Sequence, residues 1–164
     1  MKNILRLVVL VPVVLAGSGQ SPNRQADIRV TEMKALLYFD QDGTLGTFDA
    51  MEAGPDAPAL WNTSTGEGAA GGKSSNTTVV LVRITGPHET PRNATLHVVA
   101  TADWPTPRSP LADRRISLKP YFGLPVVWIP VVLYGTGCAR VTVTASVEGS
   151  TPGVTRAIAF RCGE

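Results

Sequence analysis

Short apolar segments, each ended by glycine, proline or Asp-Gly, recur along the chain and limit what it can fold into. The clearest of them are residues 28–39, 77–85, 94–102, 126–134 and 140–147. β-Branched residues are frequent in these segments and favour strands. The 16 Gly and 13 Pro are dispersed without a period, which excludes collagen and argues against long helices. The sequence therefore predicts an all-β protein.

Weaker strand signals lie between the clear ones, at residues 44–48, 60–61, 114–118 and 154–161. Asp42-Gly43, between two apolar runs, is a hairpin signal because glycine tolerates the positive φ of a tight turn. About seven or eight short strands without a helix-period segment predict an antiparallel β-sandwich, immunoglobulin-like by pattern. The tryptophan that immunoglobulin domains carry between their cysteines is missing, since Trp128 precedes both cysteines.

Residues 126–134 are apolar at nearly every position, as is typical of a strand buried on both faces. Trp128 lies in this segment, so we expect it in the core. Pro130 has no amide hydrogen to donate, which predicts a bulge, an edge position or a break at that point.

The N-terminal residues have the parts of a secretory signal peptide. Lys2 and Arg6 precede an apolar run over residues 7–16, and Gly17-Ser18-Gly19 follows. We expect residues 1–19 to be removed, residues 20–26 to form a flexible N-terminus and residues 27–164 to form the sandwich domain. No later apolar run reaches the about 18 residues of a membrane helix. The predicted location is secreted or periplasmic.

The charge balance argues against nucleic acid as a partner. Of 15 Lys and Arg, two lie in the predicted signal peptide, which leaves 13 basic and 13 acidic side chains in the mature chain. Nucleic-acid-binding proteins carry an excess of basic residues that neutralise phosphates. The expected partner is instead a protein or a glycan.

Cys138 and Cys162 are the two cysteines of the chain. In an exported protein they are predicted to form one disulfide, and they are too few for a cysteine-based zinc site. Both flank the hairpin expected from residues 140–147 and 154–161. Each is twelve positions from Ser150, so a hairpin centred there sets them opposite each other at a spacing suited to a disulfide.

The apolar pattern of this hairpin favours a different register. Centring on Ser150 places Ile158 and Phe160 on the threonine face of residues 140–147. A shift of one residue would gather them with Val141 and Val143 but would separate the cysteines. A single β-bulge near Gly137 would satisfy both requirements.

Residues 34–45 contain an apolar strand that runs into Asp40-Gln41-Asp42-Gly43-Thr44. This stretch resembles the first motif of the haloacid dehalogenase-like phosphatases. The resemblance implies that Asp40 is a nucleophile, that Asp42 is the general acid/base and that both lie beside Mg²⁺. It covers about a dozen residues. The late acidic pair of that family is missing, as are the crossover helices of its parallel sheet.

The same stretch offers oxygen ligands for Ca²⁺, from Asp40, Asp42 and Asp49. An EF-hand would need an acid where Tyr38 stands, together with flanking helices, so only a loose surface site fits. The alternative without a metal is a β-turn whose aspartates bond to nearby amides. His88 and His97 have no neighbouring His or Cys at metal-ligand spacing, and no ordered Ser/His/Asp arrangement is visible.

Two long turn-rich segments, residues 50–75 and 104–110, are the expected contact regions, because long loops on a rigid scaffold often carry function. Trp104 is the candidate binding residue. Asn62, Asn76 and Asn93 each begin an Asn-x-Ser/Thr sequon.

The sequence thus favours an exported, non-catalytic binding or structural module without a required cofactor. A Mg²⁺-dependent phosphatase that uses Asp40 and Asp42 is one alternative. The other is a Ca²⁺-stabilised adhesion or carbohydrate-binding module.

Overall fold

The computed structural model describes residues 28–52, 60–61, 75–86, 93–103, 110–121, 123–136, 139–150 and 152–161. These residues form ten β-strands and one short 3₁₀-helix, with no α-helix among them. None of their helical residues forms a segment with the length and hydropathy that crossing a bilayer requires. The predicted all-β class is confirmed.

The strands follow one another with short connections wherever the chain is described. Their bounds are β1 (Arg29–Phe39), β2 (Thr44–Leu45), β3 (Leu60–Trp61), β4 (Thr77–Thr85), β5 (Thr95–Ala102), β6 (Pro110–Ser117), η1 (Lys119–Tyr121), β7 (Val126–Tyr134), β8 (Val141–Val147), β9 (Val154–Ile158) and β10 (Phe160–Arg161).

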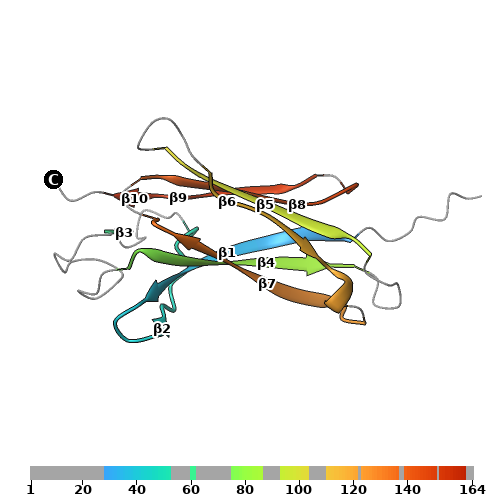
Figure 1. Cartoon of the computed structure of the whole chain (residues 1–164), viewed down its shortest axis with the longest axis horizontal. Helices are drawn as coiled ribbons and strands as arrows, with labels where there is room; N and C mark the ends of the chain where they lie inside the picture. Colours follow the sequence, from blue (N-terminus) through green and yellow to red (C-terminus); the bar gives the residue numbers. More distant parts are fainter. Residues whose placement is uncertain are drawn as a thin grey trace, which may run out of the picture.

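Two antiparallel four-stranded sheets stack face to face (Figure 1). One has the order β2-β1-β4-β7 and the other the order β6-β5-β8-β9, while β3 and β10 form a separate parallel pair. The chain changes sheet between β4 and β5, between β6 and β7, and between β7 and β8. This arrangement confirms the predicted antiparallel sandwich. Its immunoglobulin-like character remains a prediction.

The core lies between the sheets and takes every second side chain of the long strands. Alternation along a strand sends neighbouring side chains to opposite faces, so β4 buries Val80, Val82 and Ile84 while residues between them point outward. β8 likewise buries Val141 and Val143. Each sheet therefore has one face in the core and one outer face.

A β-bulge near the start of β1 adjusts this alternation. The register against β4 shifts between Val30 and Glu32. Val30 and Met33 are three residues apart, yet both are buried. The extra residue restores the inward phase of the strand.

The segment after β1 returns along its outer edge as predicted, but as a shorter strand. Only Thr44 and Leu45 pair with β1. Beyond them, the Gly46 amide donates to the Leu37 carbonyl over 2.8 Å and the Ala50 amide to the Ala35 carbonyl over 2.7 Å. This edge of β1 is thereby covered. The predicted strand at 114–118 is longer than expected, since β6 begins at Pro110.

The β8–β9 hairpin takes the register favoured by the apolar pattern. Val141 lies opposite Ile158, and both side chains are buried. Both cysteines lie outside the described residues, so their pairing remains a prediction. The hairpin is tight at Gly153, where an added Cβ would lie 2.9 Å from the Ala145 carbonyl oxygen.

Candidate functional site

The Asp-Gly motif forms the turn between β1 and β2. The amides of Asp42 and Gly43 both donate to the Phe39 carbonyl, over 3.1 and 2.9 Å. Gly43 has a φ of 65°, a conformation that glycine adopts without strain. Asp40 and Asp42 are exposed on this turn.

Asp49 has a different position and role from the other two aspartates. Its Oδ1 accepts the amide of Ala35 over 2.8 Å and that of Met51 over 3.0 Å. The carboxylate thus acts as a backbone acceptor at the edge of β1. Within the described ranges, no three His, Cys, Asp or Glu side chains are grouped closely enough to hold a metal ion. The structure does not bring the three predicted carboxylates together as one site.

The fold differs from the one that the phosphatase resemblance implies. That resemblance requires a parallel sheet with helices on both faces. Both large sheets here are antiparallel, and no α-helix occurs in the described part of the chain. Asp40 follows β1, an antiparallel strand with β2 beside it, instead of a central parallel strand. The described sandwich therefore lacks the parallel, helix-covered sheet on which the phosphatase alternative depends.

Several predicted contact residues lie outside the described residues. They include Trp104 and most of residues 50–75 and 104–110. Asn62 belongs to this group too, whereas Asn76 and Asn93 are exposed at the ends of described segments.

The outward side of β7 is the most unusual surface of the described chain. Its five outward-pointing residues are all exposed and all uncharged; they are Val126, Trp128, Pro130, Val132 and Tyr134. Trp128 is 37% exposed and Tyr134 is 69% exposed. The prediction that Trp128 and both faces of this strand are buried is wrong, because only one face of each sheet meets the core and the outward residues of β7 are exposed.

Two neighbouring strands extend this surface across the sheet. Val132 and Pro130 lie beside Val79 and Leu81 of β4. Those two residues lie in turn beside Leu36 and Lys34 of β1. The set that we call the apolar face comprises Leu36, Tyr38, Val79, Leu81, Val126, Trp128, Pro130, Val132 and Tyr134. Contiguous apolar surface of this kind commonly marks an interaction site.

One end of the apolar face carries charges of both signs. Glu32 contacts Arg83 over 3.2 Å and Lys34 over 3.4 Å. Lys34 Nζ and Arg83 Cζ also lie 5.7 and 6.0 Å from the centroid of the Trp128 ring. These side chains are 37–42% exposed, so each pair contributes at most about 1 kcal/mol to stability. Both cations lie within the range of a cation–π contact with the indole.

One edge of β7 pairs with no described strand, and Pro130 at its centre limits the addition of another strand there. Gly86 donates to the carbonyl of the facing residue Pro125, and bonded residues alternate along an antiparallel ladder. The odd-numbered residues of β7 therefore bond to β4, and the even-numbered ones direct their backbone groups toward the edge. Pro130 belongs to the second set, so it removes no bond within the sheet. Of the three outcomes predicted for this proline, the edge position is confirmed.

The outer face of the other sheet has the opposite character. We call this the polar face, and it comprises His97, Asp113, Arg115, Thr142, Thr144, Ser146 and Thr155. His97 Nε2 lies 2.8 Å from Asp113 Oδ1, Arg115 Nε donates to Glu148 Oε1 over 3.1 Å, and the hydroxyls of Thr144 and Thr155 lie 3.0 Å apart. Such groups are readily solvated, as expected of a sandwich face that meets water.

His97 is the one predicted histidine that the structure places. Asp113 bonds to its ring, and Ser146 lies directly across the ladder on β8. The three residue types of a hydrolytic triad thus meet here. His97, Asp113 and Ser146 lie on the outer side of β5, β6 and β8, where His97 and Asp113 form a surface polar pair.

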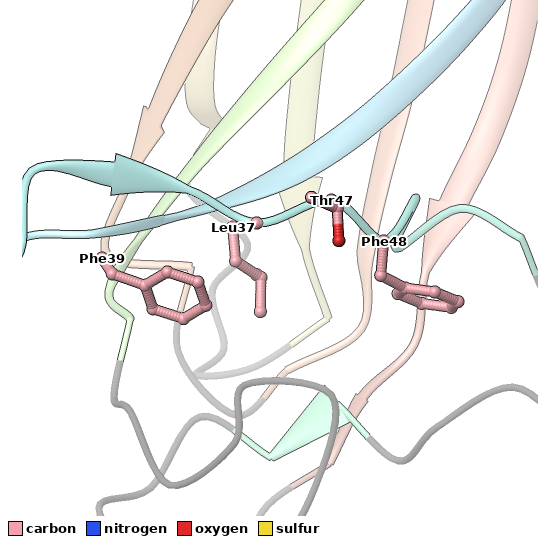
Figure 2. A pocket seen from close by; sticks show the side chains of 5 residues that line it. Leu37, Phe39, Thr47 and Phe48 are labelled. Carbon is pink, nitrogen blue, oxygen red and sulfur yellow. The ribbon is translucent and has the colours of Figure 1, made fainter.

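A small pocket lies at the edge of β1 and is lined by Leu37, Phe39, Gly46, Thr47 and Phe48 (Figure 2). The side chains of Leu37, Phe39 and Phe48 line it from one side of the backbone. Its surroundings offer Thr47 as the single polar side chain. The pocket lacks the convergent polar groups that orient a substrate.

Comparisons with known proteins place no further constraint on this site. No protein-family model, no curated protein and no solved structure matches the chain.

The apolar face was missed by sequence reasoning because residues 126–134 are apolar at both phases of the strand. One signal was available in the composition of the two phases. The outward phase contains Trp128, Pro130 and Tyr134, whereas the inward phase contains only Val, Ile and Leu. Proline fits an edge, and amphipathic aromatics are enriched where a surface meets a partner.

Proposed function

We propose that this protein is an exported, non-catalytic binding module that docks onto another protein through the apolar face. The observation that carries the proposal is the run of five exposed, uncharged outward residues on β7. The polar face of the same sandwich provides an internal reference. Both are outer faces of one sandwich, and the exposed strand β7 of the first carries no charged or hydroxyl-bearing residue except Tyr134, whereas the second carries threonines, Ser146 and ion pairs.

The composition of the apolar face resembles that of a protein interface. Interface cores are enriched in Trp, Tyr and Arg and depleted of isolated charges. Trp128, Tyr134, Tyr38 and Arg83 provide these residue types in neighbouring strands. The charged side chains pair with one another at one end, which corresponds to the polar rim of an interface.

A glycan partner is the alternative that exposure of Trp128 favours, since sugars stack on open indole rings. Lys34 and Arg83 lie over this ring, where they compete with a sugar for its π-surface. A protein partner does not need an uncovered indole ring, because its side chains can pack against the whole apolar face. A protein partner therefore fits the arrangement better.

Ca²⁺ stabilisation, if it occurs, would involve Asp40 and Asp42 without Asp49. The Asp49 carboxylate is directed to the β1 edge by two amides. The proposal includes export, on the basis of the signal-like residues 1–19. It also includes a disulfide between Cys138 and Cys162.

The proposal is tested by site-specific photo-crosslinking in the organism that makes the protein. A benzophenone amino acid replaces Val132 on the apolar face, and in a matched control it replaces Thr144 on the polar face. Both are exposed β-branched positions in the middle of a strand. We expect a discrete protein adduct from position 132 and none from position 144. Absence of an adduct at 132, or equal adducts at both positions, would contradict the proposal.

A further inference from the structure

We infer that the protein which covers the apolar face is a second copy of this chain, packed sheet against sheet about a two-fold axis. This inference rests on the proposed function and names its partner. It follows from the order of residues along the face and from the blocked edge of β7.

Most of the apolar face and the charged side chains beside it form four rows that run across β1, β4 and β7, and Val126 lies beyond the fourth row. The first row is Tyr38, Thr77 and Tyr134; the second is Leu36, Val79 and Val132; the third is Lys34, Leu81 and Pro130; the fourth is Glu32, Arg83 and Trp128. The charged row and the tyrosine row are thus at opposite ends, with apolar rows between them.

A two-fold axis that runs between the second and third rows, in the plane of the contact, matches unlike rows of the two copies. The tyrosine row of each copy then meets the charged row of the other. Tyr38 faces Glu32 of the other copy and Tyr134 faces Trp128, while Thr77 between the two tyrosines is buried and adds no exposed surface. These are donor–acceptor and aromatic pairs, which contribute to binding.

The two inner rows match in the same arrangement. Val79 faces Leu81 of the other copy, and Val132 faces Pro130. Leu36 faces the aliphatic stem of Lys34, which can lie along apolar surface while its ammonium group stays paired with Glu32. An isologous contact repeats each of these pairs twice. A face that carried charges of one sign could not be self-complementary in this way.

The size of the face suits a weak, reversible dimer. The four rows span seven residues on each of three strands, which cover about 330 Å² in plan at about 3.3 Å per residue and about 4.8 Å between strands. Two such faces amount to about 660 Å² in plan, and side-chain relief adds accessible area beyond the plan. This total lies below the about 1,200–2,000 Å² of stable specific interfaces and in the range of transient contacts. Twisted sheets with flat apolar faces pack on one another about 10 Å apart.

Edge-to-edge pairing is the competing route to a dimer, and Pro130 opposes it. Antiparallel pairing of two β7 strands about their centre would set Pro130 opposite its own copy, where neither residue has an amide to donate. Shifted registers also lose bonds at this residue. Proline on an edge is a known block to strand addition. The face remains as the contact surface.

The test is the molar mass of the protein in solution, produced from the full 164-residue sequence and measured by light scattering over about 1–100 µM, a range suited to interfaces of this size. We expect the mass to rise toward twice the monomer mass. Val132→Asp should remain monomeric, because a carboxylate then faces Pro130 of the other copy. Thr144→Asp, the same kind of change on the polar face, should dimerise as the wild type does. Tyr134→Ser, at a residue that is 69% exposed, should weaken dimerisation at least tenfold without affecting folding.

A wild-type protein that stays monomeric at the highest concentration would overturn the inference. So would a folded Val132→Asp variant that dimerises like the wild type. If the crosslinking experiment captures a different protein at position 132 while the purified protein is monomeric, the second-copy inference fails and the proposed function stands. If position 132 yields no adduct, both fail.

Discussion

Asp49 offers the sharpest test of how this sandwich finishes the edge of β1. Its Oδ1 accepts two backbone amides, those of Ala35 and Met51. Ala35 is fully buried, so its amide has no access to water. The neighbouring amide of Ala50 donates to the Ala35 carbonyl. Asp49 and Ala50 together replace the strand that would otherwise pair with β1 at this point.

The expected cost of Asp49→Ala follows from the two amides separately. The buried Ala35 amide loses its acceptor, which costs about 1–3 kcal/mol. The Met51 amide is only partly buried, so water replaces much of its bond and the cost is about 0.5 kcal/mol. The variant should lose about 1.5–3.5 kcal/mol of unfolding free energy in all. Asp49→Asn keeps a neutral carbonyl acceptor and should lose about 1 kcal/mol.

Urea denaturation followed by far-ultraviolet circular dichroism measures this loss. With slopes of about 1–3 kcal/mol per molar urea, the midpoint for Asp49→Ala should fall by about 1–2 M. Asp40→Ala is the matched control, since that residue is an exposed turn aspartate, and its midpoint should stay near that of the wild type. A midpoint for Asp49→Ala equal to that of the control would refute the structural role.

The same variants decide whether Asp49 belongs to a cation site. If the carboxylate serves only the two amides, Ca²⁺ and a chelator change the wild-type and Asp49→Ala melting temperatures equally. A stabilisation by Ca²⁺ that disappears only in Asp49→Ala would show that Asp49 is a metal ligand. It would contradict the assignment made from Ala35 and Met51.

The remaining predictions concern β7, the last hairpin and the cysteines. Leu133→Ala should lose about 2–5 kcal/mol by opening a cavity, while Val132→Ala should lose less than about 1 kcal/mol; similar urea midpoints would contradict the one-sided burial of β7. Gly153→Ala should lose about 1–3 kcal/mol, because its Cβ meets facing backbone that cannot move aside, and an unchanged midpoint would show that the hairpin adapts. A Cys138–Cys162 disulfide should lower the intact mass by two hydrogens, and its reduction should cost about 3 kcal/mol; two thiols that react freely in the folded protein would contradict it.

The strands were predictable where the sequence alternates. Residues 141–147 place valine and alanine on one phase and Thr142, Thr144 and Ser146 on the other. This pattern specifies both the strand and the side that it buries. β4 was equally clear as a strand, because β-branched residues dominate it.

The functional surface was not predictable because its strand is apolar at both phases. The two-residue alternation of side chains along the strand then does not indicate which side faces water. Burial of β7 is decided by which face of its sheet packs against the second sheet. That packing, like the pairing of β7 with β4, arises from long-range contacts. Residues 128 and 81–83, which share the apolar face, are more than forty positions apart in the sequence.

The role of Asp49 was missed for a related reason. Its type and spacing from Asp40 and Asp42 suggest a ligand set when read along the chain. Asp49 Oδ1 instead accepts the amide of Ala35, which lies fourteen residues earlier. The two residues become neighbours only after the chain has turned at Gly43. A carboxylate that replaces a strand partner leaves no signature distinct from that of a metal ligand.

Because its two outer faces differ, a single molecule should take a preferred orientation at a boundary between water and an apolar phase. The outer face of the sheet with β5 and β8 carries hydrated threonines and ion pairs. The outer face of the sheet with β7 exposes valine, proline and indole. A monomer is therefore amphiphilic on the scale of a whole domain. At an air–water or oil–water boundary it should adsorb with β7 toward the apolar phase and β8 toward the water, and form a film of uniformly oriented molecules.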